Sequence, residues 1–422
     1  MLDRDAAAAL LSRQGEAGYV YPAYETACVA DVPAAGLSLL DDSFANALPA
    51  RAFEGVATDV EHVVVLVLDG LGWDQWCRDR AESTFLETLS TAGRVTPLTS
   101  IYPSETAAAI TSLHTGVPAI EHGLLGWFAY LPEFDEPIFT LPFETLAGTP
   151  LDEAHPEADA SHLFDAEPIY DRAGAAGIET HAFQPRSVTG TVYSEAAMGD
   201  AERHGYGNFP RLGMGLRRHI EATEGPAYTF VYSKEPDAVS HAVGTDGDGY
   251  DTTVSTIGHV LQRELVAGLD PAAASRTLLL VTADHGHLNT DATTRVNLAR
   301  DLGGISEHLA RRPDGTPIGP QGGPRNLQFH VRDGHLDALR TQLETAMPCR
   351  TFDRTEYLSR GLFGPGDPSA AFERRAPDLV AVHRDAAVWD DDRGLDNVGV
   401  HGGLSRSEML VPLAAARLDA LQ

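Results

Sequence analysis

Three apolar runs in the chain are rich in β-branched, leucine or aromatic residues, and each ends shortly before an aspartate. Uninterrupted apolar runs of this length are typical of parallel strands that are buried on both faces. The carboxyl ends of such strands form the edge at which open α/β sheets bind ligands, so the three aspartates predict one shared site. The runs are His62–Leu68, Tyr228–Tyr232 and the segment that starts at Thr277, and the aspartates are Asp69, Asp237 and Asp284.

Helical patterns alternate with these runs. An amphipathic pattern over Tyr250–Leu269 predicts one helix, and an apolar stripe after a candidate N-cap, Asp333, predicts another. Further strands are predicted at Asn326–Val331 and Leu379–His383. The alternation predicts an α/β fold with a doubly wound, mostly parallel sheet that is flanked by helices. The stripe consists of Leu336, Leu339, Leu343 and Met347.

The stretch from residue 127 to residue 225 has a different character. It is rich in aromatic, proline and acidic residues, and its strand and helix patterns alternate less evenly. We expect it to form a cap that is inserted into a single domain spanning residues 1–422. No fixed-period repeat or low-complexity tract interrupts this domain.

The charge balance is strongly acidic. Asp and Glu total 61 against 31 Lys and Arg, which gives a formal net charge of −30, and Lys234 is the only lysine. Such a surface is typical of salt-adapted proteins of the haloarchaeal type, because salt screens the repulsion between carboxylates. Clustered basic residues that could neutralise the phosphates of a nucleic acid duplex are missing, so we expect no such partner.

We expect a cytoplasmic protein with no membrane partner. The three cysteines are widely spaced, the start of the chain is acidic and lacks a basic signal region, and the apolar runs are short. The longest strongly apolar run, Val63–Leu68, is far shorter than the ~20 residues that a membrane helix needs. The expected compartment is a high-salt cytoplasm. No pattern favours a particular oligomeric state.

A candidate nucleophile lies in the segment Tyr102–Gly116, YPSETAAAITSLHTG. Pro103 and Ser104 precede an alanine-rich helix that Gly116 is placed to end. Thr106 therefore falls in the first helical turn, where free N–H groups favour an alkoxide and a bound phosphate. The alternative is a threonine that only caps the helix.

Aspartate and histidine residues recur at spacings that suit metal ions. The DxxxH spacing of Asp237 and His241 places both on one face of a helix, and Asp284 and His285 follow a strand directly. His401 lies in a glycine-flanked loop near the C-terminus. Together with Asp69 and Thr106, these side chains offer oxygen and nitrogen donors for two zinc-like ions.

In their order along the chain, these motifs resemble the alkaline phosphatase superfamily, and most closely its type I phosphodiesterase/nucleotide pyrophosphatase family. The motifs are VLDG, a threonine ahead of TG and HG, DxxxH, DHG and a terminal HGG. The resemblance covers roughly residues 60–125 and 225–415. It implies an αβα sandwich of the alkaline phosphatase type.

The resemblance also implies an activity and its cofactors. It points to a hydrolase that cleaves phosphodiester or pyrophosphate bonds of a small phosphate-containing substrate through a phosphothreonine intermediate at Thr106. Two divalent ions are implied, zinc above all, and manganese or iron suit the same donors. The resemblance assigns one ion to Asp237, His241 and His401, and the other to Asp69, Asp284 and His285, with Thr106 bridging to the second ion.

The residues at two of the positions that follow the nucleophile differ from the family pattern. An aromatic residue typically follows the nucleophile and an asparagine comes two residues later, whereas this chain has Ala107 and Ala109. The backbone N–H of Ala107 remains a candidate phosphate donor. Lys234, three residues before Asp237, is a candidate substrate-binding cation, and its alternative is a solvent-facing side chain. Candidate stacking platforms in the cap are Trp127, Phe128, Tyr130 and Phe134.

Three other functions are compatible with the same donors. A phosphomonoesterase or a phosphonate hydrolase would use the same two-metal core, and a non-catalytic protein could bind metal or phosphate. A sulfatase is excluded because its CxPxR nucleophile motif is absent. His287 is a candidate to orient a metal ligand, or else a structural histidine.

Overall fold

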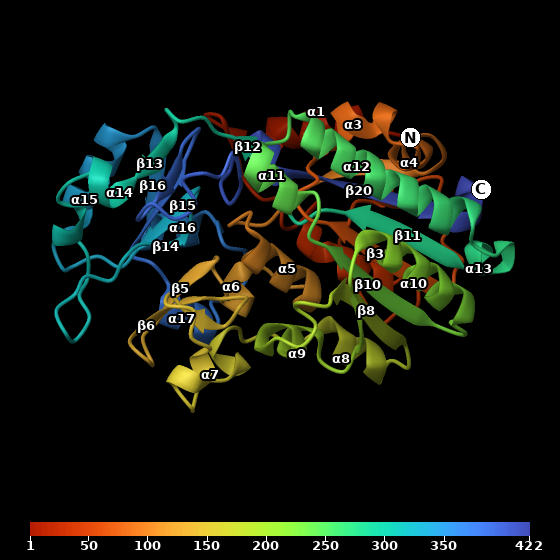
Figure 1. Ribbon diagram of the computed structural model, residues 1–422, viewed down its shortest axis with the longest axis horizontal. Coiled ribbons are helices and arrows are strands. Elements are labelled where there is room, and N and C mark those ends of the chain that lie inside the picture. The colour runs from red at the N-terminus through yellow and green to blue at the C-terminus, as the bar shows by residue number, and fades with distance from the viewer.

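The computed structural model describes all 422 residues, which form two sheets and their helices (Figure 1). The central sheet has seven strands. In spatial order they are β4 (Arg94–Thr99), β20 (Leu410–Arg417), β11 (Thr277–Thr282), β3 (His62–Leu68), β10 (Ala227–Ser233), β8 (Glu179–Pro185) and β9 (Glu202–Tyr206). The five strands from β11 to β9 run parallel to one another, and at the other edge β20 pairs antiparallel with both β11 and β4.

The central strands form where the apolar runs predict them. Every residue of β3 and of β11 is buried, as are all residues of β10 except Tyr232. Strands without a polar face must be covered on both sides, and helices supply that cover. One layer contains α3 (Trp73–Asp79), α4 (Thr84–Ala92), α10 (Phe209–Ala222) and α12 (Asp248–Leu261), and the other contains α2 (Val32–Leu37), α5 (Thr106–Thr115) and α8 (Ile169–Ala175). The predicted α/β class is confirmed.

A second sheet of seven strands lies beside the first and is antiparallel at every pairing. The strands predicted at 326–331 and 379–383 form here, away from the parallel sheet, and their apolar side chains build a separate small core. The strand order is β16 (Cys349–Asp353), β17 (Leu379–His383), β15 (Asn326–Phe329), β14 (Gln321–Gly323), β5 (Phe128–Leu131), β6 (Glu136–Phe139) and β7 (Glu144–Thr145).

The segment 127–225 divides between the two sheets, where the sequence predicted one inserted cap. Its first part supplies β5, β6 and β7 to the second sheet, and its last part supplies β8, β9 and α10 to the central sheet. Polar residues and prolines hid this regular structure because β8 and β9 lie near or at a sheet edge, where strands need no continuous apolar run.

The remaining elements include the two helices that the sequence predicted and several short helices and ribbons. The helix predicted over 250–269 appears as α12 and continues as a π-helical turn, Gln262–Ala267. The helix on the leucine stripe is α15, Leu336–Ala346, which starts after His335 and not at Asp333. The other helices are α1 (Arg4–Gln14), α6 (Ala119–His122), α7 (Leu151–Ala154), α9 (Val192–Met198), α11 (Asp237–Val243), α13 (Pro271–Ser275), α14 (Leu298–Asp301), α16 (Arg354–Ser359), α17 (Ala370–Arg375) and α18 (Arg406–Met409). Three two-stranded ribbons pair β1 (Gly15–Glu16) with β2 (Tyr19–Val20), β12 (Leu288–Asn289) with β19 (Gly399–Val400), and β13 (Arg295–Asn297) with β18 (Ala387–Trp389).

None of the helices combines the length and the apolar character needed to cross a bilayer. In Figure 1, α5 and α11 lie between the two sheets. Their N-termini carry Thr106 and Asp237, so the candidate chemistry is placed in this region.

Candidate active site

Three neighbouring strands of the central sheet bring the three predicted aspartates together. Asp69 follows β3 directly, Asp284 lies two residues beyond β11, and Asp237 begins α11 after β10. The backbone N–H of Asp237 donates to the Asp69 carbonyl at 2.9 Å, which ties the two loops together. The shared site that was predicted from the strand ends is therefore present in the fold.

The first candidate metal cluster consists of Asp237, His241 and His401. Asp237 and His241 occupy one face of α11, and the His241 Nε2 atom lies 3.4 Å from Asp237 Oδ1. The Nε2 atom of His401 lies 3.6 Å from the same oxygen. Two ligand atoms at 2.0–2.2 Å from one tetrahedral ion are about 3.3–3.6 Å apart, so these separations suit a shared ion.

The second candidate cluster consists of Asp69, Asp284 and His285, all of them fully buried. The Nε2 atom of His285 lies 3.3 Å from Asp69 Oδ1 and 3.4 Å from Asp284 Oδ2. The hydroxyl of Thr106 lies 3.0 Å from the same nitrogen. Thr106 thus reaches the second cluster from the start of α5.

Each histidine of the two clusters is oriented by a backbone carbonyl. The Nδ1 atom of His241 lies 2.8 Å from the Gly399 oxygen, that of His285 lies 3.1 Å from the Gly286 oxygen, and that of His401 lies 3.3 Å from the Ser104 oxygen. A proton on Nδ1 donates to each carbonyl, so the lone pair of Nε2 faces the carboxylates. This is the tautomer that binds a metal ion through Nε2.

The electrostatics show what the clusters lack. Burial, followed by the charges of Asp284 and Asp237, raises the pKa of Asp69 far above its usual range. Burial would also raise the pKa of Asp237, but His241, His287 and His401 outweigh it and hold that pKa well below its usual range. One oxygen of each aspartate is buried without a hydrogen-bond partner, namely Asp69 Oδ1, Asp237 Oδ1 and Asp284 Oδ2. Divalent cations would satisfy these oxygens, so the residues present fit two metal ions.

The hydroxyl of Thr106 is better placed for attack than its neighbours. Ser104 donates to the Gly403 carbonyl at 2.7 Å, and Thr111 donates to the Ala107 carbonyl at 2.7 Å, so both hydroxyls are engaged within the fold. Thr106 is the first residue of α5, and Gly116 ends the helix in the left-handed conformation at φ 74°. The free N–H groups of the first turn, including that of Ala107, lie beside the Thr106 side chain.

Comparison with protein families gives one match, which covers most of the chain. The model of the type I phosphodiesterase/nucleotide pyrophosphatase family matches residues 63–404. The chain belongs to this family. It is therefore a phosphoric ester hydrolase, as the resemblance implied. The family acts on phosphodiester bonds and is of the metal-dependent type.

Solved structures agree with this membership at the level of the fold. Murine ectonucleotide pyrophosphatase/phosphodiesterase 5, as an inactive variant in complex with AMP, is similar with a TM-score of 0.62 at 19% identity, covering 84% of this chain and 88% of that one. The human protein is similar with a TM-score of 0.61 at 16% identity, covering 84% and 87%. No curated protein sequence matches the chain.

A cavity with a volume of about 610 Å³ opens beside the two clusters. Both sheets contribute to its walls. Lys234 is exposed at the cavity, so the structure brings it to the site as the sequence suggested. Of the four candidate aromatic platforms, Trp127 and Phe128 line the cavity, whereas Tyr130 and Phe134 do not. Trp389 joins the wall from β18, a contribution that the sequence did not reveal.

Two polar side chains close to the clusters or to Thr106 were not identified from the sequence. Tyr232 donates its hydroxyl to Asp69 Oδ2 at 2.5 Å. Glu105 is buried beside the nucleophile, and burial raises its pKa to about 8. The position of Tyr232, two residues before Lys234 at the end of an apolar strand, was the available signal.

His287 lies behind Asp237, as the sequence allowed. Its Nε2 atom is 2.9 Å from Asp237 Oδ1, and burial lowers its pKa. Gly70 has φ 74°, and a Cβ there would lie 2.6 Å from this same nitrogen. The glycine of the VLDG motif therefore leaves room for a histidine that orients a cluster carboxylate.

Proposed function

We propose that this enzyme hydrolyses phosphodiester or pyrophosphate bonds in a small substrate, with Thr106 as the nucleophile and two divalent ions as cofactors. The observation that carries the proposal is the position of the Thr106 hydroxyl. It lies 3.0 Å from His285 Nε2, at the start of a helix and at the edge of the cluster of Asp69, Asp284 and His285.

Asp237, His241 and His401 would hold one ion, and Asp69, Asp284 and His285 would hold the other beside Thr106. Bound divalent cations lower the pKa of a hydroxyl and neutralise charge on a phosphate and its leaving oxygen. Mixed carboxylate and imidazole donors favour zinc, and they also suit manganese or iron.

The chain's own residues supply the remaining parts of the reaction. The Thr106 oxygen bonds to phosphorus while the bond from phosphorus to the leaving oxygen breaks, and the proton of the hydroxyl is balanced by protonation of the leaving oxygen. Thr106 is then esterified to a phosphate that still carries the second group of the substrate. Water then replaces the threonine oxygen and restores the hydroxyl. Free N–H groups in the first turn of α5, including that of Ala107, donate to the phosphate oxygens, and Lys234 binds the part of the substrate that carries further negative charge.

The cavity walls favour a diester with an aromatic group over a simple monoester. Trp127, Phe128 and Trp389 face a space large enough for a nucleotide-sized molecule. AMP binds the similar murine protein. Because Ala107 and Ala109 replace an aromatic residue and an asparagine of the family pattern, we propose that stacking comes from these wall residues and not from α5.

Substitution of the nucleophile tests the mechanism. We expect Thr106→Ala to lower kcat on bis-p-nitrophenyl phosphate at least about 10³-fold, because the attacking oxygen is lost, and Thr106→Ser to retain measurable turnover. Acid quenching of the wild type during turnover, followed by peptide mass spectrometry, should detect a p-nitrophenyl phosphate group esterified to Thr106. Full activity of Thr106→Ala in zinc or manganese would contradict the assignment.

A panel of substrates tests the specificity. The p-nitrophenyl ester of AMP should be cleaved with a higher kcat/KM than methyl p-nitrophenyl phosphate, p-nitrophenyl phosphate or an aryl phosphonate. A preference for the monoester or the phosphonate would replace the diester by the corresponding alternative.

A further inference from the structure

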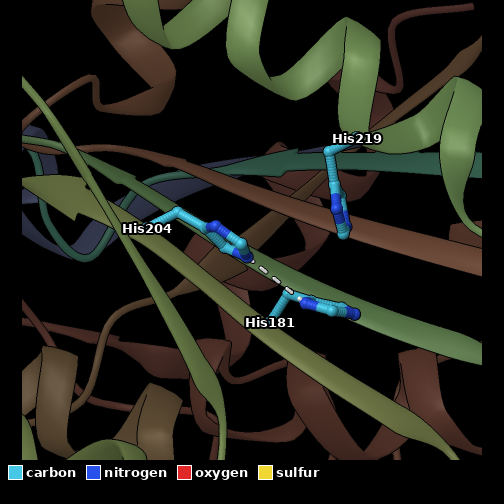
Figure 2. A group of neighbouring side chains, drawn as sticks. All are labelled: His181, His204 and His219. Carbon is cyan, nitrogen blue, oxygen red and sulfur yellow. Dashed lines mark hydrogen bonds between the residues drawn. The ribbon is translucent and has the colours of Figure 1, made fainter.

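A second histidine cluster lies at the opposite end of the central sheet from the active site. His181 is near the start of β8, His204 is on the edge strand β9, and His219 is in the last turns of α10. Figure 2 shows His219 descending from its helix toward the two strand histidines. The active-site aspartates follow the carboxyl ends of β3, β10 and β11. The histidine cluster therefore shares no residue with the clusters of the active site.

Strand register explains why the side chains meet. His181 pairs with Glu202, and Phe183 pairs with His204, across the parallel β8–β9 ladder. Side chains two residues apart share a face of the sheet, so His181, Glu202 and His204 all project toward α10. Placement on one sheet face under one helix makes the cluster a consequence of the fold and not of a mobile loop.

The separations between the donor atoms suit one small ion. The Nε2 atom of His204 lies 3.3 Å from His181 Nδ1, and each of the three histidines offers a nitrogen within 4.8 Å of the others. Two nitrogens bound to a tetrahedral zinc ion at 2.0–2.1 Å are about 3.3–3.4 Å apart. The carboxylate of Glu202 lies 3.5 Å from His181 Nδ1 and 3.8 Å from His204 Nε2.

Hydrogen bonds within the protein do not account for the whole cluster. Thr229 contacts the Nε2 atoms of His62 and His219 at 2.8 and 3.0 Å, and this orients His219. The Nε2 atom of His181, on the other side of the ring from the Nδ1 that faces His204, is buried without a hydrogen-bond partner and lies 3.7 Å from the Glu179 carboxylate.

We propose that His181, His204 and His219 bind one divalent transition-metal ion of the zinc type, with the Glu202 carboxylate as the fourth ligand. Imidazole nitrogens select zinc, nickel or copper over magnesium and calcium. The ion would join the edge strand β9 to its neighbour β8 and to α10. Since His204 is on an edge strand and Glu202 is largely exposed, an ion has access from solvent.

Metal stoichiometry provides the test, with Zn²⁺ alone as the probe. The wild type, His204→Gln and His259→Gln are equilibrated with buffered zinc and desalted, and the zinc content per chain is measured by plasma mass spectrometry. His259 is a matched control because it is exposed on α12, away from any cluster. We expect His204→Gln to hold one equivalent less than both the wild type and His259→Gln, with its diesterase activity changed less than twofold.

A second variant separates metal binding from folding. Glu202→Gln alters a side chain that is 68% exposed, so it should leave the thermal unfolding of the metal-free protein unchanged. We expect it to weaken the affinity of the third zinc about tenfold in calorimetric titrations. Equal zinc content in the wild type and His204→Gln, or equal affinity in Glu202→Gln, would overturn the proposal. The difference of one equivalent is independent of whether the active site is loaded.

Discussion

The two ends of the central sheet carry histidines that are held in different ways. At the carboxyl ends, His241, His285 and His401 each face a backbone carbonyl through Nδ1, which fixes Nε2 toward buried aspartates. At the amino ends, His181 and His204 contact each other, and His219 contacts the hydroxyl of Thr229. Backbone carbonyls are rigid partners, whereas side chains can rotate, so only the first arrangement is fixed in advance of an ion.

The two ends of the sheet also differ in how much buried negative charge they carry. Three aspartates with unpartnered buried oxygens remain at the carboxyl ends, and a buried carboxylate without a cation is costly. The imidazoles and the largely exposed glutamate at the amino ends include no buried carboxylate and carry no such cost. The active site therefore requires cations to reach its lowest free energy, whereas the amino-end cluster tolerates their absence, which makes it suited to a weaker, stabilising site.

Loss of one carboxylate at the active-site end should have the largest effect. We expect Asp237→Asn to lower kcat/KM for bis-p-nitrophenyl phosphate at least about 10³-fold, because the charge shared by His241 and His401 is lost. Glu179→Gln, at the amino end of β8, is the control and should be near wild type, since its side chain is 66% exposed. Zinc content and steady-state rates check both variants. Equal loss in the two would remove the distinction between the sheet ends.

A histidine that is buried but belongs to neither end of the central sheet allows the effect of burial to be measured by itself. This residue is His383 on β17. Burial and then Arg325 lower its pKa to about 3, so only the unfolded chain takes up its proton between pH 6.5 and about 3. Stability from this group is present above pH 6.5 and is lost as the pH falls, by about 2–3 kcal/mol at pH 4.5.

His383→Leu should therefore flatten the acid limb of the stability profile, which urea unfolding between pH 7 and 4.5 would measure. The pH 7 value accounts for any change in packing. A parallel displacement of the whole curve, without a change of slope, would show that His383 does not titrate as described.

Removal of the single lysine should have the smallest effect. Lys234 is exposed at the cavity, and exposed ion pairs contribute about 0.2–1 kcal/mol. We expect Lys234→Ala to raise KM for the p-nitrophenyl ester of AMP about two- to fivefold with kcat unchanged, and Lys234→Arg to restore most of the affinity. Unchanged KM in Lys234→Ala would reduce the lysine to a solvent-facing residue.

The middle of the central parallel sheet could be predicted from the sequence because β3, β11 and most of β10 have no exposed face. His62–Leu68 and Thr277–Thr282 are buried throughout, and burial on both faces of a strand requires an apolar sequence that is nearly uninterrupted. The second sheet was not predicted as a separate unit. Its strands pair with partners distant in the chain, as in the contact of Gly322 with Phe128, and local patterns do not encode such pairings.

The sequence by itself determined the candidate residues of the site, because DxxxH on a helix and Asp-His after a strand are short-range arrangements whose geometry follows from the local element. Tertiary structure alone decided which of them meet. It placed Thr106 at His285, brought Trp389 from β18 into the cavity wall, and joined His181, His204 and His219 from two strands and a helix. Such encounters depend on sheet order and register, which arise from the packing of the whole chain and not from any one segment.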